Sequence, residues 1–293
     1  MAETIGNPLS WSVDAARATG RHLGAVGGAL GAGDVTETEL PRVRRIGYED
    51  LEAALRAGWE DFVACRSDVF FLCVLYPVVG LVMAWAAASG NLLPLIFPLI
   101  SGFALVGPAA AVGLYELSRR REAGLPTRWS DAFSVIGSPS FGGILALSGL
   151  LFATFVVWMI AAHGIWSATL GPEPPASLGA FFSDVFLTGA GWAMILIGTA
   201  VGFLFAAAVL AVSVVSFPLL LDRPVGLPAA VVTSIRVAGT NPGPVAIWGL
   251  IVAAGLVIGA LPAFLGFVVV LPVLGHATWH LYRRAVVPEG TLT

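Results

Sequence analysis

Charge is scarce in this sequence, and lysine is missing altogether. Only 11% of the 293 residues are charged, and the 15 lysine-plus-arginine residues are all arginine. A soluble globular protein carries about 25% charged residues, so this composition excludes an ordinary soluble domain. The chain has no basic stripe of the kind that binds nucleic acid, and no nucleic-acid partner is expected.

Cysteine and histidine are also few. The two cysteines, Cys65 and Cys73, do not have the spacing of a metal site. We expect them to lie in a reducing compartment or in lipid, so no disulfide is predicted. Of the four histidines, only His276 and His280 share a helix turn. No bound metal and no cofactor is expected.

Long apolar runs dominate what is present. Hydrophobic residues make up 57% of the chain, and the mean hydropathy is +0.89. Runs of about 18 or more apolar residues are long enough to cross a bilayer as helices. Five stretches contain no charged residue: 69–88, 92–115, 142–162, 185–221 and 237–275. The sequence therefore predicts an all-α, polytopic membrane helix bundle.

The two longest runs decide the number of spans. Residues 185–221 would form a helix of about 55 Å, too long for a hydrocarbon core of about 30 Å. The start of this run is therefore expected to form an interfacial turn before one span. Pro262, between Gly259 and Gly266, is expected to break the last run into a hairpin; a proline kink in one helix is the alternative. Six transmembrane helices are predicted, at about 69–88, 92–115, 142–162, 192–221, 244–260 and 263–282.

The arginines orient these six spans. Short cytoplasmic loops collect arginine, and in the six-span arrangement with both termini inside every arginine falls on one side of the membrane. Both termini are therefore predicted to be cytoplasmic. The domain is expected to cover residues 43–287, after a flexible or surface-docked tail at 1–42 and before a C-terminal tail at 288–293.

The spans pair as three hairpins, each preceded by a short amphipathic cytoplasmic helix. The first of these helices places five apolar residues on one face: Leu51, Leu55, Trp59, Phe62 and Val63. Similar segments begin at Trp129 and at Leu227. The span ends GPAAAVGLYELSRR and LPVLGHATWHLYRR also align, so an internal repeat is predicted; three unrelated hairpins with the same interface chemistry are the alternative.

Polar and aromatic residues gather at the cytoplasmic ends of two spans. One interpretation is a tentative ligand-binding cluster of Glu116, His276 and His280, which would hold a lipid headgroup or a partner subunit. A metal site is a further alternative, but it needs additional ligands. The interface interpretation assigns aromatic and arginine anchors at Tyr115, Trp279, Tyr282, Arg119, Arg120, Arg283 and Arg284.

The membrane interior has no ionisable residue near the centre of any predicted span. Such residues mark proton relays and ion-coupled carriers, so their absence argues against both. Small residues are common instead, and Gly198 and Gly202 form a GxxxG pair suited to close helix packing. No nucleophile motif, paired carboxylates or phosphate-binding loop is visible, and no catalytic residue is assigned.

Several runs resemble one bacterial family over about residues 43–287. These are RRIGYEDLEAALRAGWEDF, FLCVLYPVVGLVMA, FPLISGFALVGPAAAVGLYELSRRRE, SVVSFPLLLDR and LPVLGHATWHLYRR, which look like domain-of-unknown-function family 2189. The resemblance implies an integral membrane protein without an established activity. Some family members are labelled as cytochrome c oxidase subunits. A haem–copper core needs six histidine ligands, and this chain has four histidines, so the label implies at most an accessory role beside a respiratory oxidase.

The function expected from these patterns is non-catalytic. We expect an integral inner-membrane protein that acts as an accessory or scaffold component, or that binds membrane lipids. The alternative is a transporter or channel for a neutral or amphipathic solute, because an interior free of charge leaves such a path open.

Overall fold

The computed structural model describes residues 40–89, 93–173 and 175–287. Within these ranges the secondary structure is helical apart from one isolated bridge between Val43 and Val286. The predicted all-α class is confirmed. Most of the tail predicted at 1–42 and all of the tail predicted at 288–293 lie outside the described residues, as does the side chain of Cys73.

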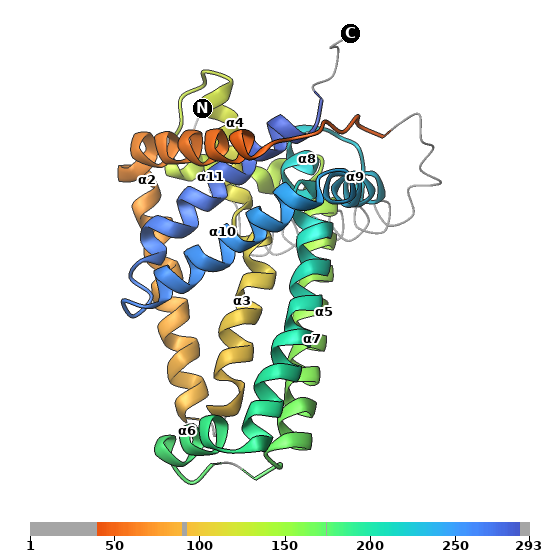
Figure 1. Ribbon diagram of the computed structural model, residues 1–293. Coiled ribbons are helices and arrows are strands. Elements are labelled where there is room, and N and C mark those ends of the chain that lie inside the picture. Colours follow the sequence, from red (N-terminus) through yellow and green to blue (C-terminus); the bar gives the residue numbers. More distant parts are fainter. Residues whose placement is uncertain (1–39, 90–92, 174, 288–293) are drawn as a thin grey trace, which may run out of the picture.

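Long helical paths run alongside one another and form the body of the molecule (Figure 1). The first is the second half of α2 (Tyr48–Ser89). The short η2 (Leu93–Leu95) leads into the second, which consists of α3 (Ile96–Ala110) and α4 (Val112–Glu122). The others are α5 (Phe141–Thr169) and α7 (Gly189–Ser213), which continues into α8 (Ser216–Asp222).

Four helical segments are long and apolar enough to cross a membrane. They are Phe97–Glu122, Phe141–Thr169, Gly189–Asp222 and Pro242–Ala260, and only 6% to 29% of each apolar window is buried inside the protein. Apolar side chains with so little protein cover need another apolar environment, which a bilayer supplies. The predicted span 69–88 lies within α2, but most of its side chains lie outside the described residues. The prediction of six full spans is not confirmed.

The last predicted hairpin has a different geometry from the expected pair of crossings. It consists of α10 (Pro242–Ala260) and α11 (Phe267–Ala285). In Figure 1 the two helices run obliquely, and their turn lies near the middle of α2 and α3 rather than at the far end. Ala263 and Phe264 make this turn with positive φ angles of 50° and 65°. The break predicted around Pro262 therefore exists, but it lies partway along the bundle.

The first amphipathic segment buries a narrow face against the rest of the protein. It is the first part of the unbroken helix α2 and lies across one end of the bundle (Figure 1). Its buried residues are Leu51, Ala54, Gly58, Asp61 and Cys65. Trp59 and Val63, which belong to the predicted apolar face, are 51% and 45% exposed. Ala54 and Gly58 lie at the centre of this buried face because another helix approaches there too closely for large side chains.

Two short helices occupy the corresponding places before the other hairpins. They are η3 (Trp129–Gly137) and α9 (Leu227–Thr240), and both have a buried and an exposed side. The remaining helix, α6 (Leu178–Leu187), lies across the opposite end of the bundle from the first part of α2 (Figure 1). The described parts of the chain thus begin and end at the same end, where Val43 and Val286 meet.

Trp158 joins three of the long helices. It is buried on α5, and its indole N–H donates to the carbonyl oxygen of Pro98 at 3.0 Å. Its ring also packs against Phe205 of α7, with ring centroids 5.6 Å apart. Gly202 leaves space for this large ring, and Gly102 leaves space for the ring of Phe155 and the edge of Trp158.

The two glycines of the GxxxG pair are expected to differ in their tolerance of a side chain. A Cβ at Gly202 would lie 3.0 Å from the Trp158 ring, whereas a Cβ at Gly198 would meet nothing within 4 Å. We expect Gly202→Leu to reduce the free energy of unfolding by about 1–3 kcal/mol, because overpacking forces the ring to move. Thermal unfolding in detergent measures the loss. Gly198→Leu is the matched control, and equal losses in both variants would contradict the assigned packing.

Candidate functional site

Helix α11 lies directly against the first part of α2, and Gly58 makes this contact possible. A Cβ added to Gly58 would come within 2.6–2.7 Å of the backbone N, Cα and Cβ atoms of Ala277. Real Cβ atoms do not approach backbone this closely, so the two helices meet at a position that only glycine can occupy. This close approach brings polar residues of α2, α4 and α11 together.

Asp61 is the centre of the polar cluster at this junction. Its carboxylate accepts a hydrogen bond from the Ser118 hydroxyl at 2.6 Å and lies 2.9 Å from His280 Nε2. Arg121 completes the arrangement, with its Nε atom 2.9 Å from the other carboxylate oxygen. Burial would raise the pKa of Asp61, but hydrogen bonds from His280 and Ser118 outweigh it, so the pKa lies below its ordinary value.

His276 extends the cluster into the interior. Its Nδ1 atom lies 2.8 Å from Ser118 Oγ, and the residue is completely buried. Because the Ser118 proton is donated to Asp61, the serine oxygen can only accept from His276, which places the imidazole proton on Nδ1. The opposite nitrogen, Nε2, is buried without a hydrogen-bond partner.

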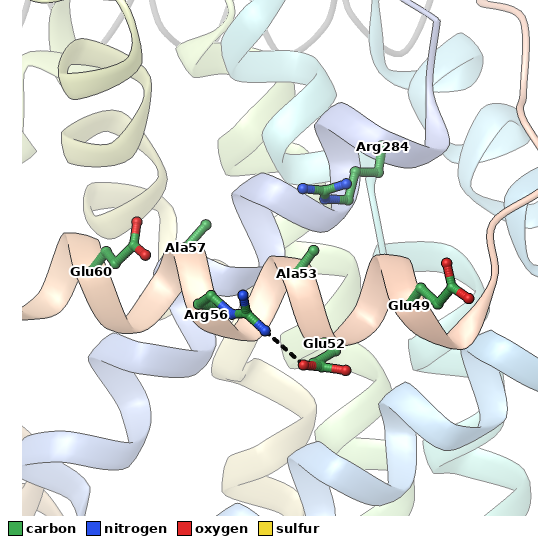
Figure 2. A pocket seen from close by; sticks show the side chains of 7 residues that line it. All are labelled: Glu49, Glu52, Ala53, Arg56, Ala57, Glu60 and Arg284. Carbon is green, nitrogen blue, oxygen red and sulfur yellow. Dashed lines mark hydrogen bonds and ion pairs between the residues drawn. The ribbon is translucent and has the colours of Figure 1, made fainter.

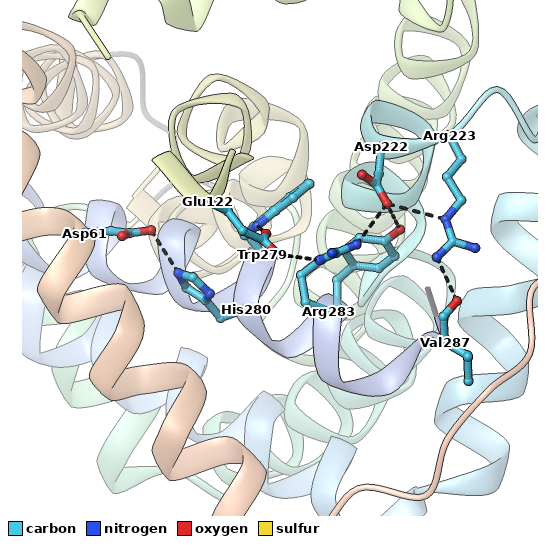
Figure 3. Close-up of polar contacts among 9 residues, drawn as sticks. Asp61, Glu122, Asp222, Arg223, Trp279, His280, Arg283 and Val287 are labelled. Carbon is cyan, nitrogen blue, oxygen red and sulfur yellow. Dashed lines mark hydrogen bonds and ion pairs between the residues drawn. The ribbon is translucent and has the colours of Figure 1, made fainter. Parts of the chain in front are cut away.

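A second polar network joins α4, α8 and α11 (Figure 3). Glu122 accepts hydrogen bonds from the Trp279 indole at 2.8 Å and from Arg283 Nε at 2.9 Å. Asp222 accepts a hydrogen bond from the Tyr282 hydroxyl at 2.5 Å and lies 3.4 Å from Arg283 Nη1. The end of α11 is therefore tied to the ends of two separate helical paths.

The two histidines of the predicted ligand cluster come together, but Glu116 does not join them through any hydrogen bond among the described residues. Glu116 instead receives two hydrogen bonds from Arg119, at 2.7 and 2.8 Å, and one from Ser134 at 3.3 Å. The carboxylate in this cluster is Asp61, which contacts His280 directly and is linked to His276 through Ser118. The sequence signal for it is the spacing of Leu51, Ala54, Gly58 and Asp61, which traces one narrow helix face with small residues at its centre.

The predicted aromatic anchors face the protein interior. Tyr115, Trp279 and Tyr282 are each at most 2% exposed, so their rings do not lie against a surrounding headgroup layer. The belt interpretation of these three residues is corrected: α11 packs over the ends of α4 and α8, and this covers its aromatic side. The predicted arginine anchors Arg119, Arg120, Arg283 and Arg284 are partly exposed and take part in ion pairs.

The two ends of the described chain are fastened at the same place. The backbone N–H of Arg44 donates to the Ala285 carbonyl at 2.8 Å, and that of Val287 donates to the Arg42 carbonyl at 2.9 Å. Asn241 accepts from the backbone N–H of Ile46 and donates to the Arg44 carbonyl. Sequence reasoning missed Asn241, because a single asparagine before a proline reads as an ordinary turn.

A shallow depression of about 420 Å³ lies on the outer side of α2 (Figure 2). Three glutamates, two arginines and two alanines line it: Glu49, Glu52, Glu60, Arg56, Arg284, Ala53 and Ala57. Arg56 and Glu52 form an ion pair of 2.7 Å across one turn of the helix. This charged surface and the buried cluster lie on different sides of α2.

The hydrogen bonds of the buried cluster differ from those of a hydrolase triad. Ser118, His276 and Asp61 have the residue types of a hydrolase triad, but the serine lies in the middle and donates its proton to the carboxylate. A catalytic serine instead donates to the imidazole, which accepts its proton as a base. Across the described parts of the chain, no group of three or more histidine, cysteine, aspartate or glutamate residues is arranged to hold a metal ion.

The comparisons with known proteins point to one family. Residues 96–222, from α3 to α8, match the profile of a family described as predicted integral membrane protein (DUF2189). No curated protein and no solved structure matches the chain. The matched range is narrower than the resemblance over 43–287, and it contains three of the four candidate spans. The family match and the apolar helices together indicate an integral membrane protein that is similar to DUF2189 over residues 96–222.

Proposed function

We propose that this chain is a non-catalytic integral protein of the bacterial cytoplasmic membrane that acts as an accessory or scaffold component. The proposal rests on the end of the bundle where Arg119, Arg121, Arg223 and Arg283 lie, which we call the arginine-rich end. Buried polar side chains at this end form hydrogen bonds with one another. Asp61, Ser118 and His276 are all buried, and they fasten helices to one another instead of lining an opening. A rigid, internally bonded end of this kind suits a platform that holds a partner.

The orientation that we propose places this end in the cytoplasm, together with both termini. Its supporting observation is the distribution of arginine. Arg119, Arg121, Arg223 and Arg283 all belong to the helix ends that meet there, and the opposite end around α6 carries none. Arginine in short loops is retained on the cytoplasmic side.

The charged outer face of α2 is the surface that we assign to the partner. Glu49, Glu52, Arg56 and Glu60 are exposed there. Together with Arg284 they line the depression, which is a concave site for a partner side chain. Exposed charges guide association and discriminate between partners more than they add affinity. A respiratory oxidase is a candidate partner on the family labelling alone, and membrane lipids remain the other proposed ligand class.

Purification in mild detergent, followed by mass spectrometry of proteins and lipids, tests the accessory function. We expect the wild-type protein to retain a partner, and the double variant Glu49→Lys, Glu60→Lys to lose it because two contacts become repulsive. Asp184→Lys is the matched control, since it reverses an exposed charge at the opposite end. A lone wild-type monomer with neither a partner nor a retained lipid contradicts the accessory function.

The alternative, a transporter or channel for a neutral or amphipathic solute, predicts a polar passage between the long helices. The depression described above lies on the outer surface of α2 instead. The polar groups at the arginine-rich end are mostly bonded to one another, and this supports the scaffold proposal over the transport alternative.

A further inference from the structure

Helix α6 is held firmly across the end of the bundle that lies opposite the arginine-rich end. Ser177 caps its start by accepting a hydrogen bond from the backbone N–H of Ala180 at 3.1 Å. Thr188 ends it and caps α7 by accepting from the Gly191 N–H at 3.0 Å. A Cβ at Gly191 would lie 2.2 Å from the carbonyl oxygens of Asp184 and Val185, so the corner between the two helices requires glycine.

The sequence of α6 divides its surface into three arcs. Phe181 and Val185 are at least partly buried and form the arc packed on the protein. Phe182 and Phe186 directly follow these two residues in the sequence and lie on the next arc, where they are 54% and 50% exposed. Their rings stack on each other with the planes 10° apart. Ser183 and Asp184 lie on the remaining arc and are exposed polar residues, and Leu187, the last residue of the helix, is 80% exposed on the same arc. The exposed aromatic pair therefore lies between the protein side and the polar side of the helix.

This aromatic pair continues into an exposed apolar surface on α7. Trp192 is 53% exposed, and its indole N–H donates to the Phe186 carbonyl at 3.1 Å, which joins the two helices at the corner. Further along α7, Leu196 and Phe203 are 66% and 69% exposed. Only 6% of the apolar window in Gly189–Asp222 is buried in the protein, so this surface faces the hydrocarbon if the segment crosses a membrane.

We propose that α6 lies in the lipid–water boundary of the leaflet opposite the arginine-rich end, with Phe182, Phe186 and Trp192 inserted among the lipids. Aromatic residues concentrate at this depth because their rings are apolar while the indole N–H needs a polar partner. The polar arc of Ser183 and Asp184 then faces water, as in other amphipathic helices that lie in the membrane plane. The aromatic belt expected at Trp279 and Tyr282 is thus replaced by one at the other end.

Photo-crosslinking from α6 tests this placement. Phe182→benzoylphenylalanine and Phe186→benzoylphenylalanine replace one exposed aromatic side chain with another, and size-exclusion chromatography checks that each variant folds. The protein is reconstituted in phosphatidylglycerol–phosphatidylethanolamine nanodiscs, irradiated and analysed by mass spectrometry. We expect phospholipid adducts at both positions, because acyl chains supply the C–H bonds with which benzophenone reacts.

Asp184→benzoylphenylalanine is the matched control on the polar arc, and we expect it to give several times fewer lipid adducts. Equal lipid labelling at all three positions, or no lipid adduct at positions 182 and 186, overturns the proposal. The same irradiation in native membranes shows whether another polypeptide covers the surface, and a protein adduct in place of the lipid adduct also overturns it. This test is independent of the proposed accessory function. A purification that recovers no partner and no lipid would contradict the accessory function but would leave the placement of α6 unaffected.

Discussion

Replacing Gly58 with leucine is expected to force α2 away from α11 and to prevent normal folding. The side chain would begin within 2.7 Å of three atoms of Ala277, two of which belong to the backbone. Overpacking typically costs about 1–3 kcal/mol, and we expect a loss of about 3 kcal/mol or more here because a backbone cannot rotate away as a side chain can. The midpoint of thermal unfolding in detergent and the yield of monodisperse protein measure the effect.

Gly149→Leu is the control for the Gly58 prediction. Gly149 also lies within a helix, but a Cβ there would meet nothing within 4 Å. Leucine has a higher helix propensity than glycine by about 1 kcal/mol or less, so this variant is expected to match or slightly exceed the wild-type stability. A Gly58→Leu protein as stable as the wild type would show that α2 and α11 do not meet at Gly58 and Ala277.

Removing the carboxylate of Asp61 is expected to have the next largest effect. Asp61→Ala leaves Ser118 without its acceptor and leaves His280 and Arg121 without their common partner. Breaking a buried ion pair costs about 3–5 kcal/mol. The Arg121 side chain is 42% exposed, however, so solvent screens its attraction to Asp61 and reduces the loss. We therefore expect a loss of about 2–3 kcal/mol in the free energy of unfolding.

The contribution of Asp61 is also expected to depend on pH. The pKa of this carboxyl group is lower in the folded protein than in the unfolded chain, where it is about 3.9. The folded state therefore binds the proton less readily, and the stabilisation is complete above about pH 5 and declines as the pH falls through about 4 and below. The stability difference between the wild type and Asp61→Asn is expected to shrink over the same range.

Glu52→Gln separates this effect from a general loss of charge. Glu52 is also on α2 and pairs with Arg56, but both side chains are about 70% exposed. Exposed ion pairs on one helix contribute only about 0.5 kcal/mol or less, so this variant is expected to retain nearly full stability. An Asp61→Ala protein that loses no more stability than Glu52→Gln would refute the central place given to Asp61.

Much of the architecture could be predicted because membrane helices are determined locally. Residues 142–162 are apolar and free of charge, and they lie within α5 as expected. The glycines and prolines near residue 262 also mark a turn that exists. These signals depend only on neighbours in the chain, since a bilayer requires each segment to satisfy its own backbone hydrogen bonds.

The depth of that turn could not be predicted in the same way. Helices α10 and α11 are long enough to cross a membrane by length alone, and α10 has the composition of a span. Their oblique course in Figure 1 follows from the side chains that α11 buries against α2, α4 and α8. Periodicity identifies a helix and its faces, but it does not say which other helix will cover them.

The amino-acid sequence by itself determined that the chain is helical and apolar, where its arginines gather, and that His276 and His280 share one helix face. Only the tertiary structure decided that Asp61 pairs with His280 while Glu116 pairs with Arg119. The physical reason is distance along the chain: Asp61 and His280 are 219 residues apart, and the close approach of two helices at Gly58 and Ala277 brings them to 2.9 Å.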